Sequence, residues 1–128
     1  MIKVIMHGCN GKMGQVIAGL VAKDTEAEIV AGIDTYTGIE NDYPVFKSIS
    51  DCDVEADAII DFSSPACLTD LLEYCVEKQV PAVLCTTGYS EEELQKIKQA
   101  SEKVALLKSA NMSLGVNMLL KLLQDATK

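Results

Sequence analysis

The sequence contains no tryptophan, and its aromatic residues together amount to 5% of 128 residues. Apolar residues nevertheless make up 48% of the chain, which favours a packed globular domain over disorder. The core must therefore be aliphatic, built mainly from Val, Ile, Leu and Ala, as suits a buried parallel sheet flanked by helices. The length predicts one domain, and it is short for a complete two-substrate enzyme.

The sequence also lacks any run of basic residues, and its formal net charge is −8. A surface this acidic repels nucleic-acid phosphates and anionic membranes, so we expect neither nucleic acid nor a membrane as a partner. An acidic protein that binds an anionic cofactor must do so through local backbone N–H groups. A glycine-rich turn at a helix N-terminus provides such groups.

With one histidine and no C-x-x-C pair, the chain offers no customary zinc site. The cysteines are interpreted as reduced thiols that pack as small hydrophobic residues: Cys9, Cys52, Cys67, Cys75 and Cys85. No segment has the architecture of a signal peptide, and no apolar run approaches transmembrane length. We therefore expect a cytoplasmic protein without a metal ion.

Apolar periodicity predicts five strands that alternate with helices. The strands are expected over residues 2–6, 28–33, 57–62, 82–85 and 104–107. The helices are expected over residues 12–23, 65–78, 91–103 and from residue 113 onward. Residues 35–55 are polar and rich in turn signals, so they are predicted to form a long connection. This order predicts a Rossmann-type, doubly wound parallel sheet in a three-layer α/β/α arrangement.

Local signals support two of the helix starts. Ser64 is predicted to cap the second helix, with Pro65 at its first helical position. Residues 90–93 read Ser-Glu-Glu-Glu, which is typical of a capping box. The first helix is expected to place one apolar face against the sheet, made of Met13, Val16, Ile17, Leu20 and Val21.

The most informative motif is a glycine turn between the first strand and the first helix. Gly8, Gly11 and Gly14 follow a G-x-x-G-x-x-G spacing, and Asp34 ends the second strand twenty residues after Gly14. Glycines alone are a weak signal, but a strand, turn, helix, strand and acid in this order match the dinucleotide-binding fingerprint. The turn would hold the pyrophosphate, and a carboxylate at Asp34 would accept both hydroxyls of the adenosine ribose.

Each of these residues also has a plainer interpretation. Asp34 could simply terminate a strand, although the agreement of the whole fingerprint favours the cofactor role. Thr35 stands where an Arg or Lys would help to bind a 2′-phosphate, so NADH is the preferred cofactor over NADPH. Lys12 lies in the turn and could reach a phosphate of either cofactor, but a solvated lysine explains it equally well.

Three later strand ends offer small residues, hydroxyls and an amide at residues 61–63, 85–88 and 110–113. Ordinary turn chemistry explains any one of them, but three on one sheet edge favour a ligand-binding surface. His7 is interpreted as a structural residue at a strand end, and Asp61 as a buried or edge acid near the ligand. The sequence supports no Ser-His-Asp, Cys-His or paired-carboxylate catalytic arrangement.

In this order and spacing, the motifs at residues 8–14, 61–65, 86–88 and 109–117 resemble the N-terminal part of 4-hydroxy-tetrahydrodipicolinate (dihydrodipicolinate) reductases. The resemblance covers essentially the whole chain. It implies a cradle for the pyrophosphate made of Gly8, Cys9, Asn10, Gly11, Lys12 and Met13, with Asp34 on the ribose. It also implies a nicotinamide side comprising Cys85, Thr86, Thr87, Ser109, Ala110, Asn111 and Met112. The family usually has Gly at the position of Cys85, and many members have Phe at that of Met112.

The resemblance further implies an NAD(P)H-dependent reductase of lysine and diaminopimelate biosynthesis, acting on a cyclic imine-containing dicarboxylate. The family's proton donor and dicarboxylate-binding groups belong to a second domain, whose His-His-rich motif this sequence lacks. Residues 1–128 are thus expected to be a dinucleotide-binding domain, with residues 113–128 leading toward an absent substrate domain. It should bind cofactor without catalysing. The full-length protein is expected to be a homotetramer, and this chain monomeric or weakly associated.

Two other functions share parts of this pattern. A stand-alone NADH- or CoA-binding sensor domain would need the same turn but no chemistry, and sequence beyond Lys128 would distinguish it from a reductase. A methyltransferase that uses S-adenosylmethionine also has a glycine turn and an acid after the second strand. Its chemistry has no clear use for the Thr86-Thr87-Gly88 segment.

Overall fold

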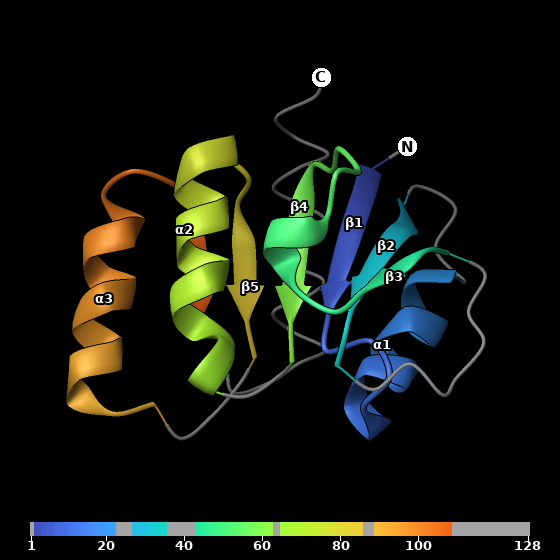
Figure 1. Ribbon diagram of the computed structural model, residues 1–128, viewed down its shortest axis with the longest axis horizontal. Coiled ribbons are helices and arrows are strands. Elements are labelled where there is room, and N and C mark those ends of the chain that lie inside the picture. Colours follow the sequence, from blue (N-terminus) through green and yellow to red (C-terminus); the bar gives the residue numbers. More distant parts are fainter. Residues whose placement is uncertain (1, 23–26, 36–42, 63–64, 86–88, 109–128) are drawn as a thin grey trace.

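The computed structural model describes residues 2–22, 27–35, 43–62, 65–85 and 89–108. Within them, six parallel strands form one sheet in the order β3-β2-β1-β4-β5-β6 (Figure 1). The strands are β1 (Ile2–His7), β2 (Ala27–Ile33), β3 (Val45–Phe46), β4 (Ala58–Asp61), β5 (Ala82–Leu84) and β6 (Leu106–Lys108). The helices are α1 (Lys12–Ala22), α2 (Leu68–Lys78) and α3 (Glu91–Ser101), with short 3₁₀ turns η1 (Ile49–Asp51) and η2 (Pro65–Cys67).

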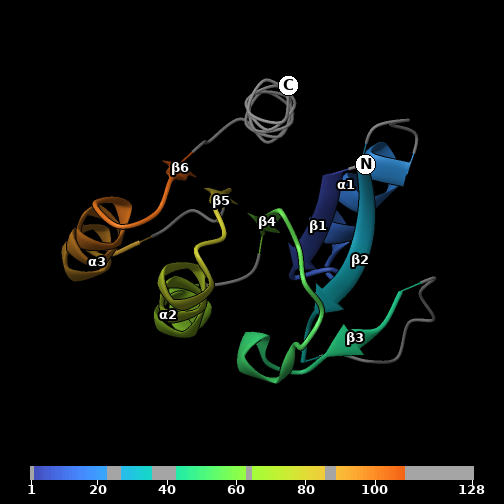
Figure 2. The same ribbon diagram turned by 90° about the horizontal axis from the view of Figure 1, so that it is seen from above.

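The helices cover both faces of this sheet. Figure 2 shows α1 on one face and α2 with α3 on the other, so the arrangement has three layers. Successive residues of β1 point to opposite faces, because side chains alternate along a strand. Val4 and Met6 pack in one apolar cluster with Val21 of α1, whereas Ile5 packs in a second cluster with Leu71 of α2. Both faces are buried, which explains why the strands read as continuous apolar runs.

The order of the strands creates a switch point beside β1. The chain runs from β1 to β2 on one side, and returns to β4 on the other side of β1. At the carboxyl ends, His7 of β1 is in register with Ile33 of β2 and with Asp61 of β4. Ligands of open α/β sheets bind where the strand order reverses in this way. The doubly wound, Rossmann-type fold expected from the sequence is therefore confirmed.

The prediction of five strands is wrong, because the connection between β2 and β4 contains the short strand β3. Val45 and Phe46 pair in parallel with Gly32 and Ile33, and the 3₁₀ turn η1 follows. Two residues are too few to show the alternation from which a strand is recognised. The sheet is thus extended beyond the predicted second strand by an edge strand that only tertiary pairing reveals.

Two helices also differ from their predictions. The α-helix α2 begins at Leu68 rather than Pro65, because Pro65–Cys67 forms the 3₁₀ turn η2, and its N-cap Cys67 makes no side-chain capping bond. Val16 of α1 is 47% exposed, so it does not belong to the buried face of that helix. The capping box of α3 is confirmed, since Ser90 and Glu93 exchange hydrogen bonds of 2.8 and 3.2 Å. The helix predicted from residue 113 onward lies outside the described residues.

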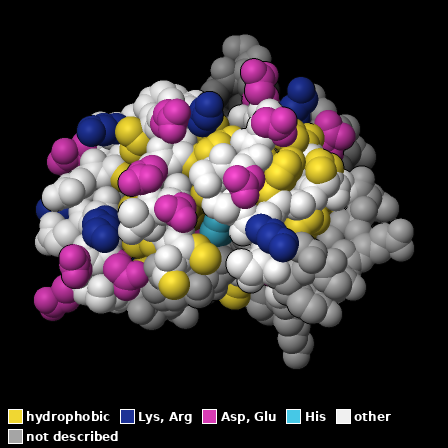
Figure 3. Space-filling view, viewed as in Figure 1, with side chains coloured by type: hydrophobic (Ala, Val, Ile, Leu, Met, Phe, Trp, Pro, Cys, Tyr) yellow, Lys and Arg dark blue, Asp and Glu magenta, His cyan; other side chains and the backbone are white. Residues whose placement is uncertain are grey.

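Acidic and basic side chains are both exposed on the surface. On the face that carries α2, lysines lie interspersed with acidic side chains (Figure 3). None of the described helices reaches the length and apolar character needed to cross a bilayer.

Candidate functional site

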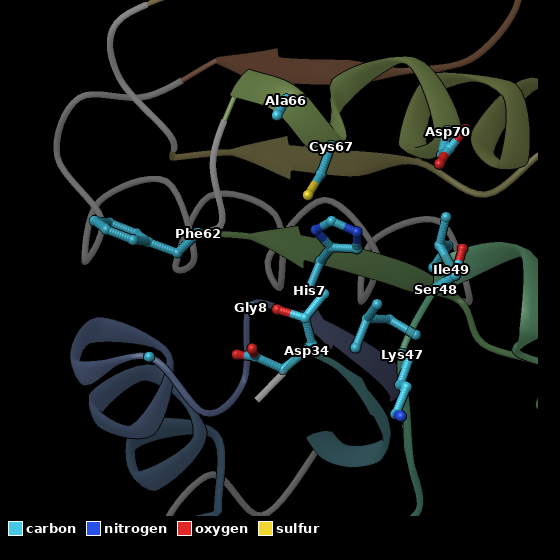
Figure 4. A pocket seen from close by; sticks show the side chains of 13 residues that line it. His7, Gly8, Asp34, Lys47, Ser48, Ile49, Phe62, Ala66, Cys67 and Asp70 are labelled. Atoms are coloured by element: carbon cyan, nitrogen blue, oxygen red, sulfur yellow. The ribbon is translucent and has the colours of Figure 1, made fainter. Parts of the chain in front are cut away.

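A cavity of about 450 Å³ opens at the carboxyl ends of β1, β2 and β4. Gly8 and Gly11 of the glycine turn line it, together with Asp34 at the end of β2 and Phe62 at the end of β4. Figure 4 shows that Gly8, Asp34 and Phe62 come from separate elements, with the ring of Phe62 directed away from His7. The cavity extends toward the segment after β3 and the start of α2, where it is lined by Lys47, Ser48, Ile49, Ala66, Cys67 and Asp70. Two groups predicted to share a site, the turn and the acid, therefore meet in one cavity.

Backbone hydrogen bonds hold the glycine turn against the end of β2. The Ile33 carbonyl oxygen accepts from the N–H groups of Gly8 at 2.7 Å and Cys9 at 3.3 Å. The Asn10 N–H donates to Asp34 Oδ2 at 2.9 Å, and the Gly11 N–H donates to the Gly8 carbonyl at 3.2 Å. Gly8 has a φ of 90°, which residues with a side chain rarely adopt. The first glycine is therefore required by the turn itself.

The other two glycines of the motif differ in how strictly the fold requires them. A Cβ at Gly14 would overlap the carbonyl group of Gly8, so glycine there lets α1 lie against the turn. A Cβ at Gly11 would stand 3.5 Å from the Gly8 carbonyl oxygen, which is an ordinary contact. The fold therefore tolerates a side chain at Gly11, whose backbone lines the cavity.

The backbone N–H groups of the glycine turn already donate hydrogen bonds within the protein, so the candidate anion site lies at the start of α1 rather than in the turn. The N–H groups of residues 8–11 all donate within the protein. The first N–H groups of an α-helix have no partner within the helix, and α1 begins at Lys12 with no acidic residue in its first turn. Partial positive charge at such a helix end favours a phosphate. The backbone of Lys12 and Met13 therefore fits the role that the sequence predicted.

A buried polar network lies at the floor of this site. His7 is 3% exposed and Asp61 is 1% exposed, and His7 Nδ1 lies 2.9 Å from Asp61 Oδ1. The Tyr89 hydroxyl donates to Asp61 Oδ2 at 3.3 Å. His7 ends β1, as expected, and Asp61 is a buried acid at the end of β4, but their contact was missed. The contact depends on the register of β1 with β4, which pairs two residues 54 positions apart in the sequence.

The cysteines are mostly inert. Burial, followed by the charge of Asp34, raises the pKa of Cys9 to about 11. Burial and then the charge of Asp61 raise the pKa of Cys75 to about 12 and of Cys85 to about 11. Because a raised thiol pKa keeps the sulfur protonated at neutral pH, these side chains act as small apolar groups, as expected. None of the five cysteines is in a disulfide.

Several predicted site residues do not face the cavity with their side chains. Cys9 is fully buried, and its sulfur occupies the space that a Cβ on Gly32 would need. Cys85 is 2% exposed and packs with Val83 on the α1 face of the sheet. Asn10 is 5% exposed. The other residues predicted for the nicotinamide side lie outside the described residues, so their cofactor role stays a prediction: Thr86, Thr87, Ser109, Ala110, Asn111 and Met112.

Among the described residues, no group of three or more His, Cys, Asp or Glu could hold a metal ion.

A sheet in this strand order, with a glycine turn and an acid at its switch point, defines a Rossmann-type dinucleotide-binding domain. Residues 2–112 match the family described as dihydrodipicolinate reductase, N-terminus. The chain belongs to this family and corresponds to its N-terminal, nicotinamide-cofactor-binding part.

Individual relatives give the same result. The 4-hydroxy-tetrahydrodipicolinate reductase of Clostridium tetani is 46% identical over 128 residues, which is 100% of this chain and 50% of the relative. The reductase of Caldanaerobacter subterraneus is 44% identical, with 100% of this chain and 51% of the relative covered. Dipicolinate-bound dihydrodipicolinate reductase from Paenisporosarcina sp. TG-14 superposes with a TM-score of 0.74 at 25% identity, covering 87% of this chain and 48% of that one. The chain thus spans about half the length of the curated relatives it matches.

We expect Gly14→Ala to lower the free energy of unfolding by about 1–3 kcal/mol, because the new methyl group forces α1 away from the turn. Gly19→Ala is the matched control on the same helix, since no atom lies within 4 Å of a Cβ there. It should raise the stability by about 0.5–1 kcal/mol through helix propensity. Urea unfolding followed by circular dichroism measures both, and equal effects of the two variants would contradict the close approach.

Cys67 should be the first thiol to react with a maleimide at pH 7.5. It is the one cysteine that is not buried, and its side chain points toward His7 in the cavity (Figure 4). Cys9, Cys75 and Cys85 should stay unmodified in the native protein, because they are buried and protonated. Mass spectrometry of digested, labelled protein checks the order, and Cys67→Ser should abolish the fast label. Rapid labelling of Cys9 or Cys85 would contradict their burial.

Proposed function

We propose that this chain is the cofactor-binding half of a dihydrodipicolinate reductase of lysine and diaminopimelate biosynthesis. The whole enzyme would transfer a hydride from NADH or NADPH to a cyclic, imine-containing dicarboxylate. The observation that carries the proposal is that the glycine turn and the Asp34 carboxylate meet in one cavity at the switch point of a chain of this family. The Paenisporosarcina reductase has dipicolinate bound, and dipicolinate is itself a cyclic dicarboxylate.

The residues that are present fit a dinucleotide. The fold itself does not require glycine at position 11, but the absence of a side chain there leaves room for a phosphate. The first turn of α1 has no acidic residue that would repel an anion. In this arrangement the backbone N–H groups of Lys12 and Met13, at the start of α1, would hold the pyrophosphate over the turn of residues 8–11. Asp34 would accept the hydroxyls of the adenosine ribose. The bound cofactor would supply the hydride, while this chain binds and orients it.

The nicotinamide end would lie along the strand ends after β5 and β6. The residues proposed there are Cys85, Thr86, Thr87, Ser109, Ala110, Asn111 and Met112, by the resemblance of their motifs to the family. Because Cys85 points into the core, its contribution would come from its backbone. No catalytic residue is proposed within residues 1–128, since the proton donor belongs to the family's substrate domain.

NADH is the proposed cofactor rather than NADPH. Asp34 lines the cavity, and its carboxylate would repel a 2′-phosphate. Thr35 beside it is exposed and uncharged. Lys47 brings a positive charge to the same cavity from the segment after β3, so the discrimination against NADPH is expected to be moderate. The whole enzyme is proposed to be a cytoplasmic homotetramer, with this chain monomeric or weakly associated.

We expect Gly11→Ala to weaken NADH binding about tenfold or more, which corresponds to about 1.4 kcal/mol per factor of ten. The methyl group would occupy the space left for the phosphate, while the fold accepts it at an ordinary contact distance. NADH fluorescence titration measures the affinity, and urea unfolding should show nearly unchanged stability. Gly19→Ala should bind NADH like the wild type. The proposed site is wrong if the wild-type chain does not bind NADH, or if Gly11→Ala binds it unchanged.

Asp34→Ala should weaken NADH more than NADPH. Loss of the hydrogen bond from Asn10 disturbs the turn for both cofactors alike, whereas loss of the ribose contact affects NADH and removes a repulsion of NADPH. Asp70→Ala is the matched control, because it removes the same charge from another wall of the cavity. It should leave the ratio of the two affinities unchanged. An equal loss of both affinities in Asp34→Ala would argue against the ribose contact, as measured by parallel titrations.

A further inference from the structure

Asp61 lies where three segments of the proposed cofactor site meet. His7 directly precedes the glycine turn, Phe62 directly follows Asp61, and Tyr89 directly follows the Thr86-Thr87-Gly88 segment. The His7–Asp61–Tyr89 network joins these segments through side chains. Its three members are separate from the glycines of the turn and from Asp34, to which the pyrophosphate and ribose are assigned.

Asp61 holds its neighbours by both its backbone and its side chain. Its carbonyl oxygen accepts the N–H of Cys85 at 2.9 Å, and its Oδ2 accepts the hydroxyl of Tyr89 at 3.3 Å. Cys85 and Tyr89 are the described residues on either side of positions 86–88. Both ends of that stretch are therefore attached to one residue of β4.

The other carboxylate oxygen is fixed by β1. Asp61 Oδ1 lies 2.9 Å from His7 Nδ1, and the His7 carbonyl oxygen accepts the N–H of Phe62 at 2.9 Å. His7 Nδ1 and the Tyr89 hydroxyl each lie within hydrogen-bonding distance of one carboxyl oxygen of Asp61, and both groups can donate a hydrogen bond to it. Burying a carboxylate is unfavourable unless such donors surround it, so the side chain has little freedom to turn.

The hydroxyl of Tyr89 is separable from the packing of its ring. The ring is partly buried and packs against the apolar cluster that includes Leu71 and Ile97. A phenylalanine would keep this packing and lose the bond to Asp61. The hydroxyl is therefore explained by the carboxylate that it reaches, rather than by the core.

We propose that Asp61 is a positioning residue, and that the Tyr89 hydroxyl bonded to it sets the nicotinamide end of the cofactor site. His7 keeps the carboxylate turned toward Tyr89. The inference rests on the proposed function, because it presumes that residues 86 and 87 contact the nicotinamide half of the cofactor. It predicts that the network affects the nicotinamide half of the dinucleotide and spares the adenosine half.

The test compares NADH with ADP-ribose, which has the same adenosine and pyrophosphate but no nicotinamide. In the full 128-residue chain, Tyr89→Phe should raise the Kd for NADH about five- to tenfold, as loss of a hydrogen bond to a charged group does. The Kd for ADP-ribose should stay within about twofold. Fluorescence titration measures NADH, and calorimetry measures ADP-ribose. A general loss of structure would weaken both ligands, so the ratio separates positioning from stability.

Three further variants sharpen the comparison. Tyr74→Phe removes a hydroxyl from a buried tyrosine of α2 and should leave both affinities unchanged. His7→Asn keeps a side-chain N–H donor near the position of Nδ1 and should retain the wild-type ratio. His7→Leu removes that donor and should lower NADH affinity selectively. Because this variant also leaves a buried carboxyl oxygen without its partner, it can prevent folding. Tyr89→Phe is therefore the variant that decides the result.

Each outcome has a defined meaning. A selective loss of NADH affinity in Tyr89→Phe supports the inference, and restoration by His7→Asn relative to His7→Leu supports the part assigned to His7. Unchanged NADH affinity in Tyr89→Phe, or equal losses for both ligands, overturns it while leaving the proposed function intact. A wild-type chain that binds neither NADH nor ADP-ribose overturns the proposed function, and the inference with it.

Discussion

The carbonyl oxygen of Ile33 accepts hydrogen bonds from Gly8 and Cys9, and the adjoining Asp34 carboxylate accepts one from Asn10. Three consecutive amides of the turn are thereby bound to the end of β2. This attachment forces Gly8 to a φ of 90° and brings the start of α1 over the turn, where only glycine fits at position 14. The position of Asp34, the direction of α1 and the shape of the cavity all follow from it.

The parts of this arrangement that are local in sequence could be predicted from it. The turn and Asp34 were recognisable because the fingerprint fixes their spacing along the chain. The 3₁₀ turn before α2 was not, because Pro65 suits the first position of either helix type. The exposure of Val16 was missed because a helical wheel does not show where a flanking helix or strand ends. The His7–Asp61–Tyr89 network was missed because it joins residues up to 82 positions apart through tertiary pairing.

An acidic protein can hold an acidic ligand only if local fields oppose the overall charge. The formal net charge is −8, and both Asp34 and Asp70 line the cavity. The opposing field comes from the start of α1, whose first turn contains no acid, and from Lys47. Helix-end charge falls off within about one turn, so it acts on a phosphate at that end and hardly elsewhere. In the proposed site, this division would let Asp34 accept a ribose hydroxyl a short distance away from the groups that attract phosphate.

A buried carboxylate is a poor way to stabilise a sheet, since well-packed apolar residues often serve as well or better. Its advantage at position 61 is that it forms hydrogen bonds in defined directions and so orients its neighbours. An apolar pair between β1 and β4 would hold the strands together without orienting anything beyond them. A carboxylate has two oxygens, and here one is used by His7 and the other by Tyr89. The carboxyl group that joins β1 to β4 at the switch point therefore also bonds to Tyr89, in the segment beyond β5. Burying this polar group thus also constrains the edge of the sheet where the cofactor is proposed to bind.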